Sequence, residues 1–312
     1  MAEENWERRL VEQLATEGLR EQRRARRWGI FFKLLTFTVV FIVLLTAVGV
    51  FGQREVACLD RCTALIELRG ELDADAPASA ENVITGLQAA FRNKGTQGVV
   101  LRINSPGGSA VQAGEINDEI RRLRGKYPDT PIYAVVEEIC ASGAYYVAVA
   151  TDRIYVDKAS LVGSIGVIID GFGFVGTLDK LGIERRALTA GDNKAFLDPF
   201  LPMTQEQKDY ALKMLGEIHQ QFIAAVKAGR GARLKESPEL FSGLIWNGAR
   251  SIELGLSDAL GSVGYVARDV IKAEDVVDFT VQETLTERLA RRFGTTLGRS
   301  IFGAAQHPTR RY

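Results

Sequence analysis

Residues 139–168 read ICASGAYYVAVATDRIYVDKASLVGSIGVI, and the fold expected for the rest of the chain is organised around them. The stretch predicts a small-residue turn with a hydroxyl at Ser142, an apolar helix, a strand, a second turn with Ser164, and another strand. A serine at a helix start has two interpretations. It caps the free amides of the first turn, or it is a nucleophile placed where those amides stabilise an oxyanion. Capping is the ordinary case for a lone serine, so the remaining sequence has to decide.

Short strands and helices alternate on both sides of this stretch. Apolar runs predict strands at 64–68, 98–103, 132–137 and 184–188, and apolar spacing predicts helices at 83–91, 113–123 and 204–227. Such repeated units predict an α/β fold with a mostly parallel sheet, because parallel neighbours need crossover connections. Ligands bind at the carboxyl ends of strands in such sheets. Ser142 and the turn Pro106-Gly107-Gly108 are both expected at that edge.

The N-terminal part of the chain predicts a membrane anchor. Residues 1–29 are polar and end in an arginine cluster, and residues 30–52 are long and apolar enough to span a bilayer of about 30 Å. The cluster places the N-terminus in the cytoplasm by the positive-inside rule, and all that follows the span outside. The domains expected are a cytoplasmic segment 1–29, a transmembrane helix 30–52, an extracytoplasmic catalytic domain 62–273 and a basic amphipathic tail 274–312.

Composition narrows the function further. The 312 residues carry 39 basic and 39 acidic side chains, so the net charge of zero gives no sign of a nucleic-acid partner. Three cysteines and two histidines are too few and too scattered for the usual zinc site. Cys58 and Cys62 lie outside the membrane, where they form a bridge with each other, bridge to a second chain or stay as thiols. Cys140 is a rival nucleophile, although a buried structural thiol is the commoner case.

A nucleophilic Ser142 needs a base and an oxyanion site. His219 lies beside the apolar face of a long helix and the other histidine is in the tail, so a histidine triad is not expected. Lys194 precedes the apolar run 195–201, which could bury its amine and favour the neutral form, although most loop lysines are solvated. Gly107 and Gly108 offer unobstructed amides, or simply form a tight turn. Ser164 holds the lysine by a hydrogen bond, or is an ordinary turn hydroxyl.

Four segments together resemble the signal peptide peptidase A family in its short, single-module form. They are the N-terminal anchor, INSPGGS at 103–109, EICASGAYYVA at 138–148 and LVGSIGVI at 161–168, and a lysine follows the serine by 52 residues. The resemblance runs from about residue 62 to 270. It implies a ClpP/crotonase-like fold of repeated ββα units. The chain departs from the family at Asn193, where an aromatic residue often precedes the lysine.

The resemblance also implies roles, partners and a location. Ser142 is then the nucleophile, Lys194 the general base, Ser164 the hydroxyl that orients the lysine, and Gly107, Gly108 and Gly143 the oxyanion region, with no metal and no cofactor. The expected substrates are peptides, in particular signal-peptide remnants. The expected partners are the lipid bilayer, through residues 30–52, and copies of the same chain, with sites at subunit interfaces. The expected location is the bacterial inner membrane, with the catalytic domain periplasmic.

Two other functions stay open at this point. One is an acyl-CoA hydratase or isomerase on the same fold, whose glycine amides would hold a thioester oxygen. An extracytoplasmic domain argues against it, because coenzyme A is cytoplasmic. The other is a non-catalytic membrane scaffold that keeps the fold without the chemistry.

Overall fold

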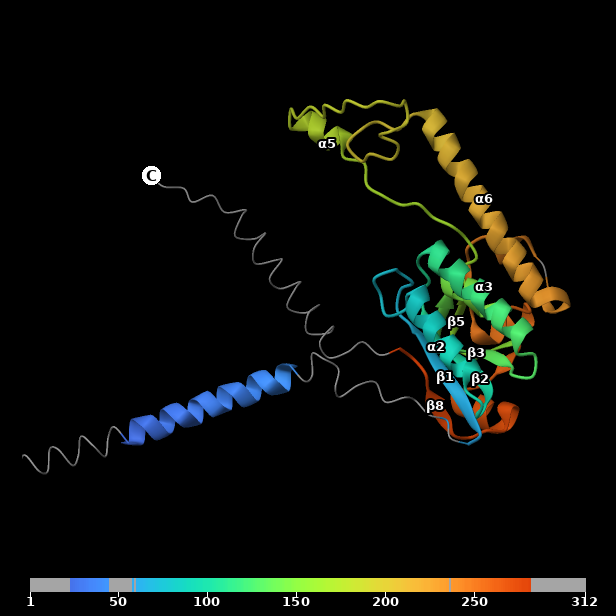
Figure 1. Cartoon of the computed structure of the whole chain (residues 1–312). Coiled ribbons are helices and arrows are strands. Elements are labelled where there is room, and N and C mark those ends of the chain that lie inside the picture. The colour runs from blue at the N-terminus through green and yellow to red at the C-terminus, as the bar shows by residue number, and fades with distance from the viewer. Residues whose placement is uncertain (1–22, 45–57, 59, 236, 282–312) are drawn as a thin grey trace, which may run out of the picture. The chain divides into compact units, whose positions relative to one another are not determined.

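The computed structural model describes residues 23–44, 58, 60–235 and 237–281 (Figure 1). The chain divides into two units, Met1–Glu55 with Glu283–Tyr312, and Val56–Gln282. In the first unit the helix Arg23–Leu44 is long and apolar enough to cross a membrane. It covers most of the predicted span 30–52, whose last residues lie outside the described part of the chain.

A mostly parallel sheet forms the centre of the second unit. Its strands are β1 (Cys62–Arg69), β2 (Thr96–Ser105), β3 (Ile132–Ala141), β4 (Arg153–Val156), β5 (Leu161–Gly163), β6 (Ile245–Asn247), β7 (Ala259–Leu260) and β8 (Val276–Asp278). The main path runs β6-β5-β3-β2-β1-β8, and β4 pairs with β3 and β7. β6 is antiparallel to β5, and the other pairs are parallel. The predicted α/β fold is confirmed.

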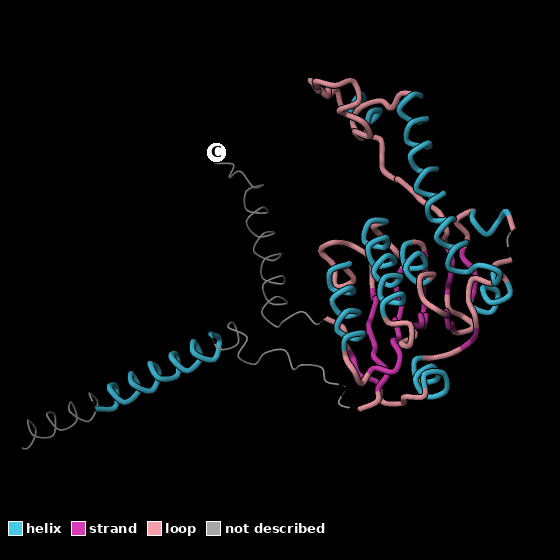
Figure 2. The backbone as a smooth tube through the Cα atoms, turned by 45° about the vertical axis from the view of Figure 1, so that its right-hand side comes forward, coloured by secondary structure: helices cyan, strands magenta, loops and turns pink. Residues whose placement is uncertain are grey.

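Side chains alternate between two cores, one on each face of the sheet. Ile66 of β1 packs with the buried faces of α2 (Ala80–Arg92), α3 (Ala110–Lys126) and α4 (Gly143–Ala148). Its neighbour Leu65 packs on the other face with Val266 and Ile271, from η3 (Val266–Ile271), the segment that follows α8 (Val263–Tyr265). Figure 2 shows the helices layered on the strands. The remaining short elements are η1 (Gly231–Arg233), η2 (Pro238–Phe241) and α7 (Gly248–Glu253).

Between β5 and the long helix α6 (Gln205–Arg230) the chain leaves the sheet as an extended arm, residues 167–204 (Figure 1). The arm contains one short helix, α5 (Val175–Lys180). The strand predicted at 184–188 is wrong: these residues form an irregular segment, because no neighbouring strand offers them a ladder of hydrogen bonds. The helix predicted at 204–227 is confirmed, and Thr204 starts it with a capping box that Gln207 completes.

The C-terminal half of α6 is fixed to the domain, whereas its N-terminal half carries the arm. Phe222 and Val226 are buried against the core. The buried guanidinium of Arg230 donates to Gly255 O at 2.8 Å and to both carboxylate oxygens of Asp258 at 2.8 and 3.0 Å. These contacts join the end of α6 to the segment beside β4 and β7.

Two observations concern the limits of the folded unit. A disulfide joins Cys58 to Cys62, the first residue of β1, so of the three alternatives the intrachain bridge is the one present. β8 adds to the sheet beside β1, and Phe279 is buried, so the folded unit continues beyond the boundary expected at 273. The rest of the predicted tail, from residue 282, lies outside the described residues.

Candidate active site

Ser142 occupies the junction between β3 and α4 in a conformation that few residues other than glycine adopt. Its φ is 52° and its ψ is −125°, and its side chain makes no capping hydrogen bond. Backbone in this region costs about 1–3 kcal/mol and is concentrated at functional sites. The main chain is held on both sides: the Ser142 amide donates to Gly163 O at 2.9 Å, and the Tyr146 amide donates to Ser142 O at 3.0 Å. The capping interpretation of Ser142 is therefore wrong.

The turn formed by Gly107 and Gly108 lies against the start of α4. Gly107 has φ of 100°, and a Cβ there would come within 2.7 Å of Gly143 N and 2.8 Å of Ser142 Cβ. Gly108 has φ of 140°, and its Cβ would meet Leu72 O at 2.3 Å. Both positions therefore require glycine for two reasons, the positive φ and the lack of space.

The amides of this turn differ in what they bind. The Gly107 amide donates to the Ser105 hydroxyl at 3.2 Å, a contact that sequence reasoning missed although Ser105 lies in the INSPGGS motif. Within the described part of the chain, the amides of Gly108 and Gly143 donate to no protein acceptor. Gly143 is the first residue of α4, where an amide has no partner inside the helix. The two amides are neighbours, because a Cβ on Gly143 would lie 3.5 Å from Gly108 N.

Ser164 follows the last residue of β5 in the same way that Ser142 follows the last residue of β3. Ala141 pairs with Gly163 in the parallel ladder, so the two serines follow directly paired residues. Ser164 also has φ of 52°. Its amide donates to Leu244 O at 2.7 Å, and its carbonyl accepts from the Gly166 amide at 2.9 Å. These contacts fix the backbone of the turn and leave the Ser164 hydroxyl available.

Ser142 and Ser164 line the same cavity, of about 510 Å³. Its remaining walls come from the glycine turn, α3, α4, the start of the arm, α6 and the loop before β6. They are Gly108, Ala110, Ala113, Gly143, Tyr146, Gly166, Val167, Ile168, Ile218, Gln221, Phe222, Ser242 and Gly243. No charged side chain is among them. The contribution of α6, in which the Phe222 ring packs at a tilt against Tyr146 with 5.3 Å between ring centroids, was not predicted. The apolar face of that helix was visible in the sequence, but the partner of this face was not.

Lys194 is not brought to Ser142 within one chain. It is exposed in a turn of the arm, where its amide donates to Gly191 O at 3.1 Å, and it does not line the cavity beside Ser142. Figure 1 shows the arm extending away from the sheet. The apolar run after Lys194 does not enclose its amine, because Phe196 packs instead on Tyr210.

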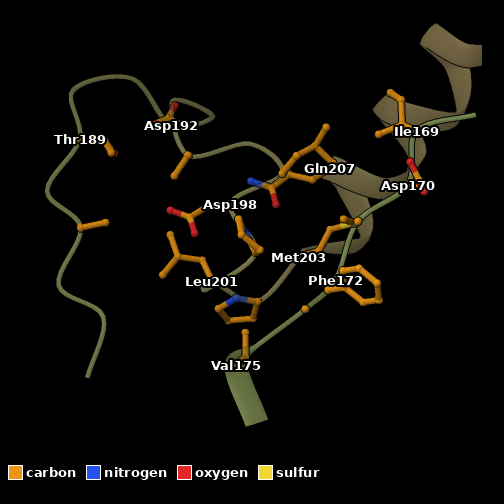
Figure 3. A pocket seen from close by; sticks show the side chains of 17 residues that line it. Ile169, Asp170, Phe172, Val175, Thr189, Asp192, Asp198, Leu201, Met203 and Gln207 are labelled. Carbon is orange, nitrogen blue, oxygen red and sulfur yellow. The ribbon is translucent and has the colours of Figure 1, made fainter. Parts of the chain in front are cut away.

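The arm has its own cavity and a large uncovered apolar surface. The cavity, of about 560 Å³, is lined by Phe172, Val175, Leu201 and Met203 together with polar groups that include Asp198 (Figure 3). Many apolar side chains of the arm face solvent, among them Phe172 at 82% exposure and Leu188 at 100%. Large apolar side chains exposed together in one segment are typical of an interaction surface.

Cys140 is excluded as a nucleophile by its surroundings. It lies within β3, two residues before Ser142, and is completely buried. Burial raises the pKa of its thiol far above the ordinary value, so the reactive thiolate does not form at neutral pH.

Residues 126–277, which include Ser142, Ser164 and Lys194, match the family profile described as Peptidase family S49. By this match the segment is an S49 domain. The match confirms the family resemblance expected from the sequence.

Several relatives resemble the chain over this region. A sequence from Enterococcus faecium whose name proposes a signal peptide peptidase, SppA, is 31% identical over 65% of this chain and 58% of its own length. A sequence from Methanocaldococcus jannaschii whose name proposes a protease is 27% identical over 88% of this chain and 92% of its own length. A Brucella melitensis protein named Na(+)/H(+) antiporter NhaA is 44% identical over 57% of this chain. The chain spans only 24% of that protein, so the transport activity in its name is not carried over.

Among solved structures, a membrane-bound stomatin-specific protease in complex with a substrate peptide aligns at a TM-score of 0.41 and 11% identity. The alignment covers 76% of this chain and 99% of that protein. ClpP1 from Listeria monocytogenes aligns at 0.40 and 13% identity, covering 64% of this chain and 91% of that one.

Proposed function

We propose that the S49 domain is an endopeptidase in which Ser142 is the nucleophile. The observation that carries the proposal is the strained backbone of Ser142 beside two amides without an acceptor, those of Gly108 and Gly143. A strained turn holds the hydroxyl at the wall of the cavity, and paired amides are the usual means of stabilising a tetrahedral oxyanion. The proposal places the carbonyl oxygen of the scissile peptide between these two amides.

Lys194 is the proposed base, supplied by a neighbouring subunit. A lysine acts as a base only as the neutral amine, which burial favours. Lys194 is exposed in the single chain, and it lies in the arm whose apolar surface lacks a cover. Docking of the arm on a second copy would cover that surface and bring the amine to a Ser142 cavity at the same time. Ser164, on the cavity wall, would then accept a hydrogen bond from the amine and aim it at Ser142.

The proposed reaction has two halves. The amine of Lys194 takes the hydroxyl proton of Ser142 as Oγ bonds to the peptide carbonyl carbon, and then gives the proton to the leaving amine as the C–N bond breaks. In the second half Lys194 takes a proton from a water molecule as the water oxygen bonds to the acyl carbon, and returns it to Ser142 Oγ as the ester bond breaks. Each step needs only the chain's own groups and water.

Peptides with an apolar, uncharged residue next to the cut are the proposed substrates. The cavity beside Ser142 is lined by apolar side chains such as Ile218 and Phe222 and by uncharged polar groups, with no charged lining group. A charged side chain would therefore lose its hydration without gaining an ionic partner. The helix Arg23–Leu44 would anchor the domain in the bacterial inner membrane with the site on the periplasmic side. Remnants of cleaved signal peptides meet both conditions.

A mixing experiment tests the nucleophile, the base and the shared site together. Ser142→Ala and Lys194→Ala should each abolish cleavage of a fluorogenic peptide by the full chain in detergent. Co-assembly of the two inactive variants should restore about a quarter of the wild-type rate, because one interface in four then pairs an intact serine with an intact lysine.

The outcomes separate the alternatives. Full activity of Ser142→Ala would rule out this nucleophile, and the absence of recovery on mixing would rule out a site shared between chains. Turnover of an enoyl-CoA without peptide cleavage would favour the hydratase interpretation. A wild-type chain that cleaves no member of a peptide library would favour the scaffold.

A further inference from the structure

His219 makes a specific contact with the segment that carries Ser164, and the proposed chemistry leaves it without a role. Its Nε2 lies 3.1 Å from the carbonyl oxygen of Ile165. A carbonyl oxygen only accepts, so Nε2 carries the hydrogen and donates it. His219 is half-buried and does not line the cavity, although its helix neighbours Ile218 and Phe222 do.

The Ile165 carbonyl lies where the sheet no longer provides partners. β5 ends at Gly163, and the residues that follow belong to no strand. Ser164 and Gly166, on either side of Ile165, both line the cavity. The Ile165 side chain is fully buried, so its backbone cannot turn to water without disturbing the core. The histidine supplies the donor that the missing strand would have supplied.

The same contact lies where α6 separates from the domain. Towards the C-terminus, Phe222 and Val226 are buried in the core, whereas α6 has no fully buried side chain before Phe222. His219 therefore links the Ser164 turn to the helix whose N-terminal end carries the arm and Lys194.

We propose that His219 is a positioning residue: its hydrogen bond to Ile165 O fixes the Ser164 turn on α6 and so places the hydroxyl that orients the base. The inference rests on the proposed function, since it acts through Ser164. His219 touches neither the substrate nor the reacting atoms.

Two substitutions at this position separate the hydrogen bond from the bulk of the ring. In His219→Gln the side-chain amide can still donate to Ile165 O, whereas in His219→Leu it cannot. We expect peptide cleavage to fall roughly tenfold in His219→Leu and to stay close to wild type in His219→Gln. Gln220→Leu, the next and exposed position of α6, is the matched control and should change nothing.

A double-mutant cycle shows whether the effect passes through Ser164. Once Ser164 is alanine, there is no hydroxyl left to place, so His219→Leu should cost little further activity. Independent, additive losses would overturn the proposal. Equal rates for the glutamine and leucine variants would also overturn it. If both rates were low, a direct base role for His219 would fit better, and if both were normal, His219 would have no role in catalysis.

A measurement that does not depend on catalytic activity tests the contact between His219 and Ile165 separately from the proposed peptidase function. Hydrogen exchange of the peptide that covers residues 164–168 should be faster in His219→Leu than in wild type, and slowed again in His219→Gln. Unchanged exchange would overturn the inference even if the enzyme is active. If the wild-type chain cleaves no peptide but the variants show this exchange pattern, the proposed function and the role of Ser164 are overturned. The anchoring of the turn by His219 would still hold. Sedimentation of each variant checks that lost activity is not lost assembly.

Discussion

Ser142 and Ser164 emerge side by side from the paired ends of β3 and β5, and both have φ of 52°. The Ser142 amide donates to Gly163 O at 2.9 Å, so the residue before one serine holds the backbone of the other. A parallel ladder thus brings two hydroxyls, 22 residues apart in the chain (164 − 142), to one cavity. This relationship makes a role for Ser164 testable separately from that of Ser142.

Ser164→Ala should slow peptide cleavage by roughly 10- to 100-fold without abolishing it, because a hydrogen bond to a group that becomes charged contributes about 1.5–3 kcal/mol. The comparison is kcat for wild type, Ser164→Ala and Ser142→Ala in the same assembled preparation. Activity of Ser164→Ala equal to that of wild type would remove the hydroxyl from the mechanism.

Gly107→Ala should abolish activity and lower stability, because its Cβ would come within 2.7 Å of Gly143 N at a φ of 100°. The added Cβ would clash with backbone atoms, and these cannot move without shifting the start of α4 and the Gly143 amide. Gly114→Ala is the matched control: it lies in α3 with nothing within 4 Å of the added Cβ, and should be neutral or stabilising by up to about 1 kcal/mol. Thermal unfolding and peptide cleavage of both variants check the contrast. A fully active Gly107→Ala would contradict the close packing.

The sequence was sufficient to predict the local features of the site. Alternating apolar runs predicted β1 to β3, and the carboxyl-end rule placed Ser142 next to the Gly107-Gly108 turn, as the structure has them. These predictions succeed because each depends on residues close in the chain or on a general property of parallel sheets.

Features that depend on distant partners were not predictable. The strand expected at 184–188 failed because a strand pattern forms a strand only beside another strand, and the arm offers none. The α6 wall of the cavity and the contact between His219 and Ile165 join segments more than 50 residues apart. The position of Lys194 is a further case: the chain alone leaves it exposed, and its proposed place in the site depends on a second subunit.

Ala113 is predicted to set the depth of the cavity beside Ser142. It is buried in α3, lines the cavity, and would lie 3.4 Å from a Cβ on Gly143. Ala113→Leu should lower kcat/KM about 10- to 200-fold for peptides with leucine or phenylalanine before the cut, and much less for alanine peptides. Ile218→Ala, on the α6 wall of the same cavity, should relax the preference towards larger residues. An unchanged preference in both variants, with thermal midpoints showing folded protein, would place the substrate side chain elsewhere.

Asp258 should control acid stability through its pairing with Arg230. The two side chains are 12% and 1% exposed and share two hydrogen bonds. Burial raises the pKa of the Asp258 carboxyl, but the hydrogen bonds and charge of Arg230, the amide of Ile154 and the charge of Arg233 together outweigh it and hold the pKa below its ordinary value. A pKa that is lower in the folded than in the unfolded state stabilises the fold at any pH above the unfolded-state pKa of about 3.9. This stabilisation is lost as the pH falls from there through the folded-state pKa.

Asp258→Asn should therefore lower the free energy of unfolding by about 3 kcal/mol at pH 7, because it leaves the buried guanidinium of Arg230 without its counter-ion. The difference from wild type should shrink as the pH falls below about 4, because the unfolded wild-type chain binds a proton at Asp258 there and the folded chain does so only at its lower pKa. Asp269→Asn removes an exposed carboxylate paired with Arg268 and should change stability by less than about 0.5 kcal/mol. Urea unfolding of the three proteins between pH 3 and pH 7 is the measurement, with the pH range set by the ordinary pKa of aspartate at about 3.9. A stability difference between wild type and Asp258→Asn that does not vary with pH would show that the pair does not depress the pKa of Asp258.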